Sequence, residues 1–112
     1  MSYYASADGK ITLARKMTDS EIHDVHTILD SFEDYVYGGE ISIIIDKRDY
    51  EEDEVKNTFK TLTEYFRARG NSIVSAEIEW HGEDNEVWRH ICYNDEWAEQ
   101  IGYIEWGEEN PF

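Results

Sequence analysis

The alternation of apolar and polar residues at positions 74–80 is the feature that most limits what this chain can fold into. Every second residue is apolar, and the residues between them are serine or glutamate. A period of two is typical of a β-strand with one buried and one solvent-exposed face. We therefore expect a strand here, with Glu77 and Glu79 in solvent. The expected core-facing residues are Val74, Ala76, Ile78 and Trp80.

Two further strands are predicted after this one. Turn-forming residues at 82–85 interrupt the alternation, and residues 87–93 have the pattern of a second strand. A second interruption at 94–96 precedes a third strand, predicted over residues 100–106. The four tryptophans of the chain all lie in or beside these strands, so we expect an antiparallel meander that supplies most of a small core. Residues 107–112 are predicted to form a frayed tail.

The first part of the chain predicts one strand and one helix. Asp8-Gly9 has the composition of a turn, and residues 10–15 alternate as expected for a strand. Thr18 and Glu21 have the spacing of a capping box, which marks the start of a helix. This helix is expected to end at Gly38-Gly39. Its buried stripe is predicted to contain Ile22, Val25, Ile28, Leu29, Phe32, Tyr35 and Val36.

Residues 40–46 are rich in isoleucine, which is typical of a central strand covered on both faces. A second amphipathic helix follows and is expected to stop at Gly70. Its predicted buried positions are Val55, Phe59, Leu62 and Phe66. Residues 1–112 therefore predict a single α+β domain with the element order β-α-β-α-β-β-β. The two helices are expected on one face of a mixed or mostly antiparallel sheet.

The chain is strongly acidic, with 26 Asp and Glu against 10 Lys and Arg and a formal net charge of −16. This charge disfavours direct binding to nucleic acid or to an anionic membrane through phosphate contacts. The aromatic content of 14% is sufficient to build a folded core. A basic protein surface or cations are the partners that the charge favours. The oligomeric state stays open.

Cysteine usage and hydropathy predict a cytoplasmic protein, in the host cytoplasm if a phage encodes it. Cys92 is the single cysteine, so we expect a buried structural thiol and no intramolecular disulfide. No apolar run approaches the roughly 18–20 residues of a membrane span. The N-terminus also lacks the apolar segment of a signal peptide.

Histidines close to carboxylates raise a metal-binding alternative. His23 and His26 share the predicted helix face with Asp19 and Asp30, and such a set could bind a divalent cation. The H-E-x-x-H spacing of zinc-binding helices is missing from the sequence. We therefore expect neither a metal nor another cofactor.

His81 and His90 raise a catalytic alternative, because either could act as a general base beside a carboxylate such as Glu83 or Asp84. The sequence has no nucleophile motif, phosphate-binding glycine loop or dinucleotide fingerprint to accompany them. Histidines held in strands by hydrogen bonds are the simpler explanation, so we assign no catalytic residue. A small hydrolase stays the last alternative.

Glu77 and Glu79 are the most informative acidic pair. Alternate residues on one face of a strand lie about 6.6 Å apart, which is comparable to the separation of successive phosphates in a nucleic-acid strand. Rows of carboxylates on a rigid element can therefore imitate a phosphate backbone. The simpler alternative is that acidic faces keep a small protein soluble. The candidate partner-binding residues are Glu77, Glu79, Glu51, Glu52, Asp53, Glu54, Asp30, Glu33 and Asp34.

Short motifs lie at both ends of the chain: YYxSxxGxI over residues 3–11, and WxGE, WR and IxW beginning at Trp80, Trp88 and Ile104. With these motifs the chain resembles a family of small uncharacterised proteins from phages and bacteria, often actinobacteria. The resemblance covers the two ends and the order of strands and helices, and it implies no activity and no site residues. In size and charge the chain is also similar to phage anti-defence proteins, including anti-CRISPR proteins and DNA mimics.

These observations favour a binding protein over an enzyme. The preferred hypothesis is a phage-type inhibitor that occupies a basic, nucleic-acid-binding surface of a host defence protein. An immunity-type protein that neutralises a basic nuclease toxin is the first alternative, and it would use the same acidic surface. The small hydrolase comes third.

Overall fold

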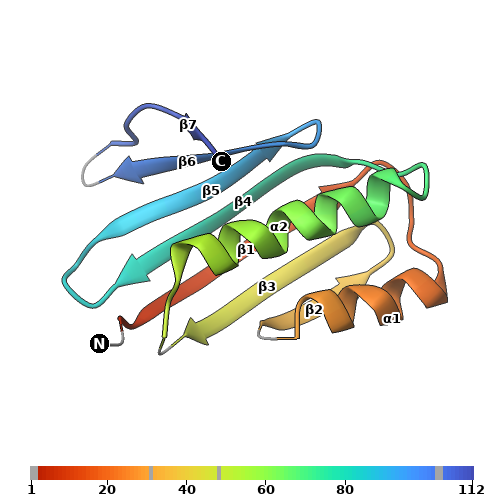
Figure 1. Ribbon diagram of the computed structural model, residues 1–112, viewed down its shortest axis with the longest axis horizontal. Helices are drawn as coiled ribbons and strands as arrows, with labels where there is room; N and C mark the ends of the chain where they lie inside the picture. Colours follow the sequence, from red (N-terminus) through yellow and green to blue (C-terminus); the bar gives the residue numbers. More distant parts are fainter. Residues whose placement is uncertain (1–2, 31, 48, 103–104) are drawn as a thin grey trace.

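The computed structural model describes residues 3–30, 32–47, 49–102 and 105–112. Across these residues, seven strands form one antiparallel sheet, and two helices cover one of its faces (Figure 1). The predicted α+β class is therefore confirmed. The elements are β1 (Ala5–Leu13), α1 (Asp19–Ile28), β2 (Glu33–Tyr37), β3 (Glu40–Lys47), α2 (Glu52–Arg67), β4 (Ile73–Gly82), β5 (Val87–Tyr93), β6 (Glu96–Gly102) and β7 (Asn110–Pro111).

The strand order across the sheet is β2-β3-β1-β4-β5-β6-β7. β1 pairs with β3 on one side and with β4 on the other, and each described pairing is antiparallel. β4, β5 and β6 form the predicted meander. The last of these strands begins at Glu96, however, and the predicted start at residue 100 is wrong. Asn94 and Asp95 adopt positive φ angles of 50° and 69°, so two residues suffice for the turn.

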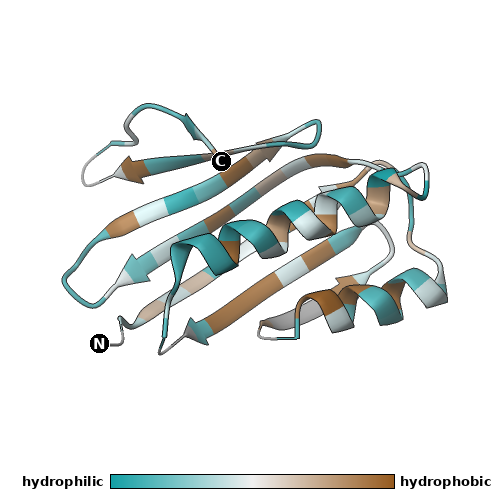
Figure 2. Cartoon of the chain, in the orientation of Figure 1, coloured by the Kyte–Doolittle hydropathy of each residue, from teal (hydrophilic) through white to brown (hydrophobic). Residues whose placement is uncertain are grey.

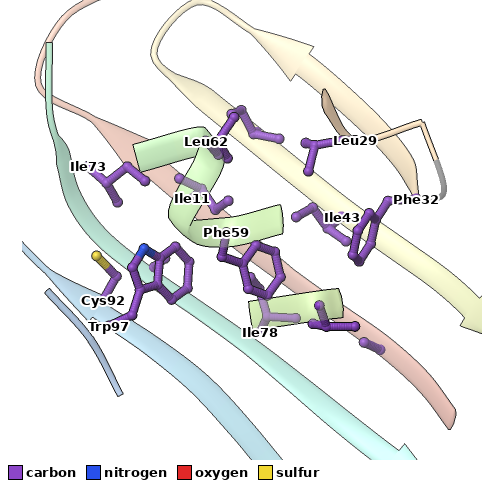
Figure 3. Packing of buried hydrophobic residues seen from close by; sticks show 14 of the residues in the cluster. Ile11, Leu29, Phe32, Ile43, Phe59, Leu62, Ile73, Ile78, Cys92 and Trp97 are labelled. Carbon is purple, nitrogen blue, oxygen red and sulfur yellow. The ribbon is translucent and has the colours of Figure 1, made fainter. Parts of the chain in front are cut away.

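The core lies between the sheet and the two helices. Phe59 and Leu62 of α2 point down onto Ile11 of β1 and Ile78 of β4 (Figure 3). Trp97 of β6 stacks on Phe59, with ring centroids 4.8 Å apart. Apolar residues accordingly alternate with polar ones along the strands and along α2 (Figure 2). The predicted buried positions of α2 are confirmed.

The first helix is shorter than predicted. Its capping box forms between Thr18 and Glu21, as expected, but α1 ends at Ile28. The prediction that it extends to Gly38-Gly39 is wrong, because residues 33–37 form the edge strand β2 and the two glycines turn the chain into β3. The segment EDYVY is rich in aromatic and β-branched residues, which favour a strand. Its apolar spacing also fits a helix, and pairing with β3 decides between the two.

β1 begins earlier than predicted, and Asp8-Gly9 lies inside it instead of forming a turn. The glycine is required by close approach to β4. A Cβ atom on Gly9 would lie 2.2 Å from the carbonyl oxygen of Glu77. Two small residues, Ala5 and Ala7, continue the buried side of the strand. Because both residues are small, the alternation of buried and exposed positions in β1 is difficult to recognise in the sequence.

β3 is covered on one face only, so the prediction of a strand covered on both faces is wrong. Ile41, Ile43 and Ile45 are buried, whereas Ile44 is 53% exposed on the opposite face. α1 and α2 lie on the same side of the sheet (Figure 1). Without a second layer in the described part of the chain, the outward residue of β3 meets solvent.

In β4, Ala76, Ile78 and Trp80 are buried as predicted, but Val74 is 41% exposed and Ile73 is buried in its place. The register between β1 and β4 shifts at Thr12 and Leu13. A register irregularity of this kind changes which residues face the core, and the alternation of β4 therefore does not extend back to Val74.

The predicted frayed tail at residues 107–112 is also wrong. Asn110 and Pro111 pair with β6 as β7. The ring of Phe112 stacks on Trp97 at a centroid distance of 5.6 Å and meets the edge of His90 at 5.0 Å. This aromatic contact holds the segment against the sheet. Among the described residues, neither α1 nor α2 combines the length and hydropathy needed to cross a membrane.

Candidate binding surfaces

The face of the sheet that the helices leave uncovered carries a shallow acidic groove. It has a volume of about 490 Å³ and runs over β3, β1 and β4. Three carboxylates line it, from Asp8, Glu77 and Glu79. We call these three residues and their surroundings the acidic groove. The remaining lining residues are Gly9, Lys10, Ser42, Ile43 and Ile44.

The strand register sets two like charges against each other in this groove. Asp8 of β1 pairs directly with Glu79 of β4. Directly opposed like charges destabilise a sheet. Within the described residues Asp8 forms no ion pair, and the carboxylate of Glu79 lies 3.2 Å from Nε2 of the exposed His81 ring. On its other side, Glu79 pairs in register with Arg89 of β5.

The negative charge of Glu77 is better compensated than the charges of Asp8 and Glu79. Its side chain is 61% exposed, and the guanidinium of Arg89 on β5 lies 3.1 Å from its carboxylate. Arg89 is held in place by Gln100, which accepts a hydrogen bond from Nε at 2.8 Å, and by the ring of Trp106, 4.3 Å from the guanidinium carbon. Asp8 and Glu79 therefore carry most of the uncompensated charge of the groove.

The other predicted acidic residues do not join this surface. Residues 51–54 lie at the start of α2, in the helix layer. Glu51, Asp53 and Glu54 line one hollow together with Ile28, whereas Glu52 lines a different hollow. Asp30 follows the end of α1. Glu33 and Asp34, predicted on a helix, belong instead to the edge strand β2. The predicted set is thus divided among several surfaces.

An aromatic pocket of about 450 Å³ lies beside the start of α2. Its aromatic walls are Tyr3, Tyr50 and Trp88, and three carboxylates also line it, from Glu52, Glu86 and Glu99. Burial is the main cause that raises the pKa of Tyr3 to about 12, and the nearby Glu86 carboxylate adds to it. We call these six residues the aromatic pocket. Val87 and Ile101 complete its lining.

His90 lies behind this pocket, fully buried. Its Nδ1 accepts a hydrogen bond from the indole Nε1 of Trp80 at 3.2 Å, and its Nε2 lies 2.9 Å from a carboxylate oxygen of Glu99. These partners assign a neutral ring that carries its proton on Nε2. The hydrogen bond from His90 is the main cause that lowers the pKa of Glu99. Both ring nitrogens are therefore engaged, which is what a structural histidine requires.

The remaining candidates stay apart. His81 lies on the uncovered face of the sheet, on the opposite side from His90. No group of three or more His, Cys, Asp or Glu in the described residues is placed to hold a metal ion. His23, His26 and Asp19 lie exposed along α1. Cys92 is buried, as predicted, and burial is the main cause that raises the pKa of its thiol to about 12.

Sequence reasoning missed Asp8 and the aromatic pocket. The alternation of residues 5–13 would have placed Asp8 on the same face as Glu77, but its small residues and Gly9 conceal it. The pocket has no local signal, because its walls come from segments far apart in the chain. No protein-family model, curated protein or solved structure matches this chain. The resemblance to small phage and bacterial proteins stays a prediction.

Proposed function

We propose that this protein binds a basic surface of another protein through its acidic groove. The observation that carries the proposal is the pairing of Asp8 with Glu79 across adjacent strands. This placement weakens the sheet slightly, and a ligand of opposite charge would relieve the repulsion. The net charge of −16 extends the attraction beyond the groove and would speed association with a basic partner.

The favoured partner is a nucleic-acid-binding protein, and the favoured role is that of a phage-type inhibitor acting in the host cytoplasm. The strand backbone spaces carboxylates on one face at about 6–7 Å, so they can occupy sites that otherwise hold phosphates. Ser42 and Ile44 contribute uncharged lining to the groove, and Lys10 lies beside them, opposite Glu77. The uncovered sheet face supplies a rigid surface for such contacts.

The test begins with capture of partners from a bacterial lysate, followed by a competition titration with the purified partner and a labelled DNA duplex. We expect the duplex and this protein to exclude each other. The double variant Asp8→Lys/Glu79→Lys should weaken binding by roughly tenfold or more, mainly by slowing association. The charge-matched control, Asp53→Lys/Glu64→Lys, changes the same net charge on α2 and should bind within about twofold of the parent.

Three outcomes would count against parts of this proposal. Simultaneous binding of duplex and protein to the partner would overturn the mimicry of nucleic acid. Loss of binding in the α2 control, with the groove variant unaffected, would move the contact surface to the helix layer. A captured basic nuclease toxin that this protein inactivates would replace the anti-defence role with the immunity-type alternative.

A further inference from the structure

The aromatic pocket has walls that are already fixed in position. The ring centroids of Tyr50 and Trp88 lie 5.2 Å apart, and Tyr3 lies 6.4 Å from each of them. The indole Nε1 of Trp88 donates a hydrogen bond to the hydroxyl of Tyr50 at 3.1 Å. Tyr50 also packs edge-on against Trp80, which is fully buried. These contacts hold the three rings in place before any ligand binds.

The charge of this pocket is not balanced by the described cations. Glu52, Glu86 and Glu99 contribute three carboxylates. Lys56 is the one described cation in ion-pair contact with them, with Nζ 2.8 Å from Glu52 and 4.0 Å from Glu99. The ring of His90 is neutral, as its hydrogen bonds require. A net negative charge therefore remains in a largely aromatic hollow.

Glu99 is the carboxylate for which the charge imbalance of the pocket matters most. Its side chain is only 13% exposed, and a carboxylate removed from water is costly unless it is paired and hydrogen-bonded. His90 supplies one hydrogen bond from a neutral donor. Lys56 is at the limit of ion-pair distance from Glu99 and is shared with Glu52. These contacts keep the pKa of Glu99 below its usual range, so the carboxylate stays charged and can attract a further cation.

We propose that the aromatic pocket binds the charged end of a lysine or arginine side chain from a partner protein. An ammonium or guanidinium group is attracted by the faces of tyrosine and tryptophan rings and forms charge-assisted hydrogen bonds with carboxylates. The apolar rings and Ile101 would contact the aliphatic part of the same side chain. Anionic groups are repelled by the three carboxylates, and neutral apolar groups leave the charge uncompensated.

This site is separate from the acidic groove. The pocket lies on the side of the sheet that carries the helices, and the groove lies on the uncovered side. A positive result here does not require the groove to bind anything, and failure here leaves the groove proposal untouched. The pocket would add a directional contact, since its walls are concave and the groove is shallow.

The experiment is a titration followed by the indole N–H signals of the four tryptophans in ¹⁵N-labelled protein. The probes are n-butylammonium, n-butylguanidinium and the neutral n-pentanol, each at fixed ionic strength and at constant pH. We expect the Trp88 signal to shift saturably with both cations and at least several-fold less with n-pentanol. Trp106, on the uncovered face, is the internal reference and should shift little. Equal shifts with n-pentanol, or no saturable shift at Trp88, would overturn the proposal.

Variants test the role of the carboxylates. Glu86→Gln removes an exposed charge of the pocket and should weaken cation binding by roughly two- to fivefold. Glu64→Gln on α2 makes the same change in net charge outside the pocket and should leave the affinity unchanged. Thermal denaturation of both variants checks that they are folded. If the two variants weaken binding equally, the cations respond to overall charge, and the proposed site is wrong.

The source of the cation is tested with N-acetyl-lysine methylamide and with the free polyamine spermidine. A lysine side chain in a peptide should bind at least as well as n-butylammonium, because the pocket is open at its mouth. If the lysine amide does not bind and spermidine does, the pocket takes a free polyamine and the assignment to a partner's side chain is overturned.

Discussion

Trp80 is the residue whose removal should damage the fold most. Its side chain is fully buried, stacks parallel to Trp88 and packs edge-on against Tyr50. A buried aromatic of this size removes about 150–250 Å² from water, which corresponds to an upper limit of about 4–6 kcal/mol at roughly 25 cal/mol per Å². Alanine retains part of that area, so Trp80→Ala should lower the free energy of unfolding by about 3–5 kcal/mol.

The hydrogen bond of Trp80 adds a second, separable contribution. Trp80→Phe keeps a ring in the core but removes the donor that satisfies Nδ1 of His90, 3.2 Å away. Leaving that buried nitrogen without a partner should cost about 1–3 kcal/mol. In the same variant, the ¹⁵N chemical shifts of His90 should report a changed environment at Nδ1, because the acceptor has lost its donor.

Urea denaturation followed by circular dichroism measures these effects, and Trp106→Ala is the matched control. Trp106 lies on the uncovered face against Gly102 and the guanidinium of Arg89, so its loss should cost about 0.5–1 kcal/mol. A domain has about 5–15 kcal/mol of stability in total, so Trp80→Ala should shift the midpoint strongly. If Trp80→Ala and Trp106→Ala have the same midpoint, the placement of Trp80 at the centre of the core is refuted.

Two further predictions concern Glu21 and Gly9. The Arg15 guanidinium is the main cause that lowers the pKa of Glu21 from 4.5 to about 2, and the Thr18 backbone N–H is the second. The stabilising contribution of Glu21 is therefore present above pH 4.5 and is lost as the pH falls from there towards 2. The urea midpoints of Glu21→Gln and the parent should converge over that range, and a constant difference between them would contradict this prediction. Gly9→Ala places a Cβ 2.2 Å from the Glu77 carbonyl oxygen and should lower the melting temperature through a cost of about 1–3 kcal/mol, whereas Gly39→Ala, whose nearest contact is 3.7 Å, should melt close to the parent.

The parts of the fold that sequence could predict are those with a long, unambiguous period. Residues 87–93, the capping box at Thr18 and the apolar stripe of α2 each have one pattern that fits one structure. β2 could not be predicted, because Phe32, Tyr35 and Val36 have spacings that suit a helix as well. Only the pairing of this segment with β3 distinguishes the two, and such pairing is a property of the tertiary fold.

The candidate surfaces also differ in how far the sequence predicts them. Glu77 and Glu79 face solvent because they alternate with Ile78 and Trp80, and that much follows from sequence. The pairing of Glu79 with Asp8, and of Glu77 with Lys10, depends on the register between β1 and β4, which the sequence does not give. The aromatic pocket depends on three-dimensional proximity alone, since Tyr3, Tyr50 and Trp88 have no periodic relation. This pocket can therefore be recognised only in the three-dimensional structure.

The central position of β1 determines the order in which the sheet can be completed. β1 leaves the ribosome before both of its neighbours, yet it pairs with β3, which begins at Glu40, and with β4, which begins at Ile73. The edge of β1 that pairs with β4 therefore stays unpaired until most of the chain is synthesised, and unpaired edges invite association between chains. β4, β5 and β6 close through short local turns, which form faster than distant pairings. Folding is thus expected to start from the C-terminal meander, and β1 joins it as a template for β3 and β2.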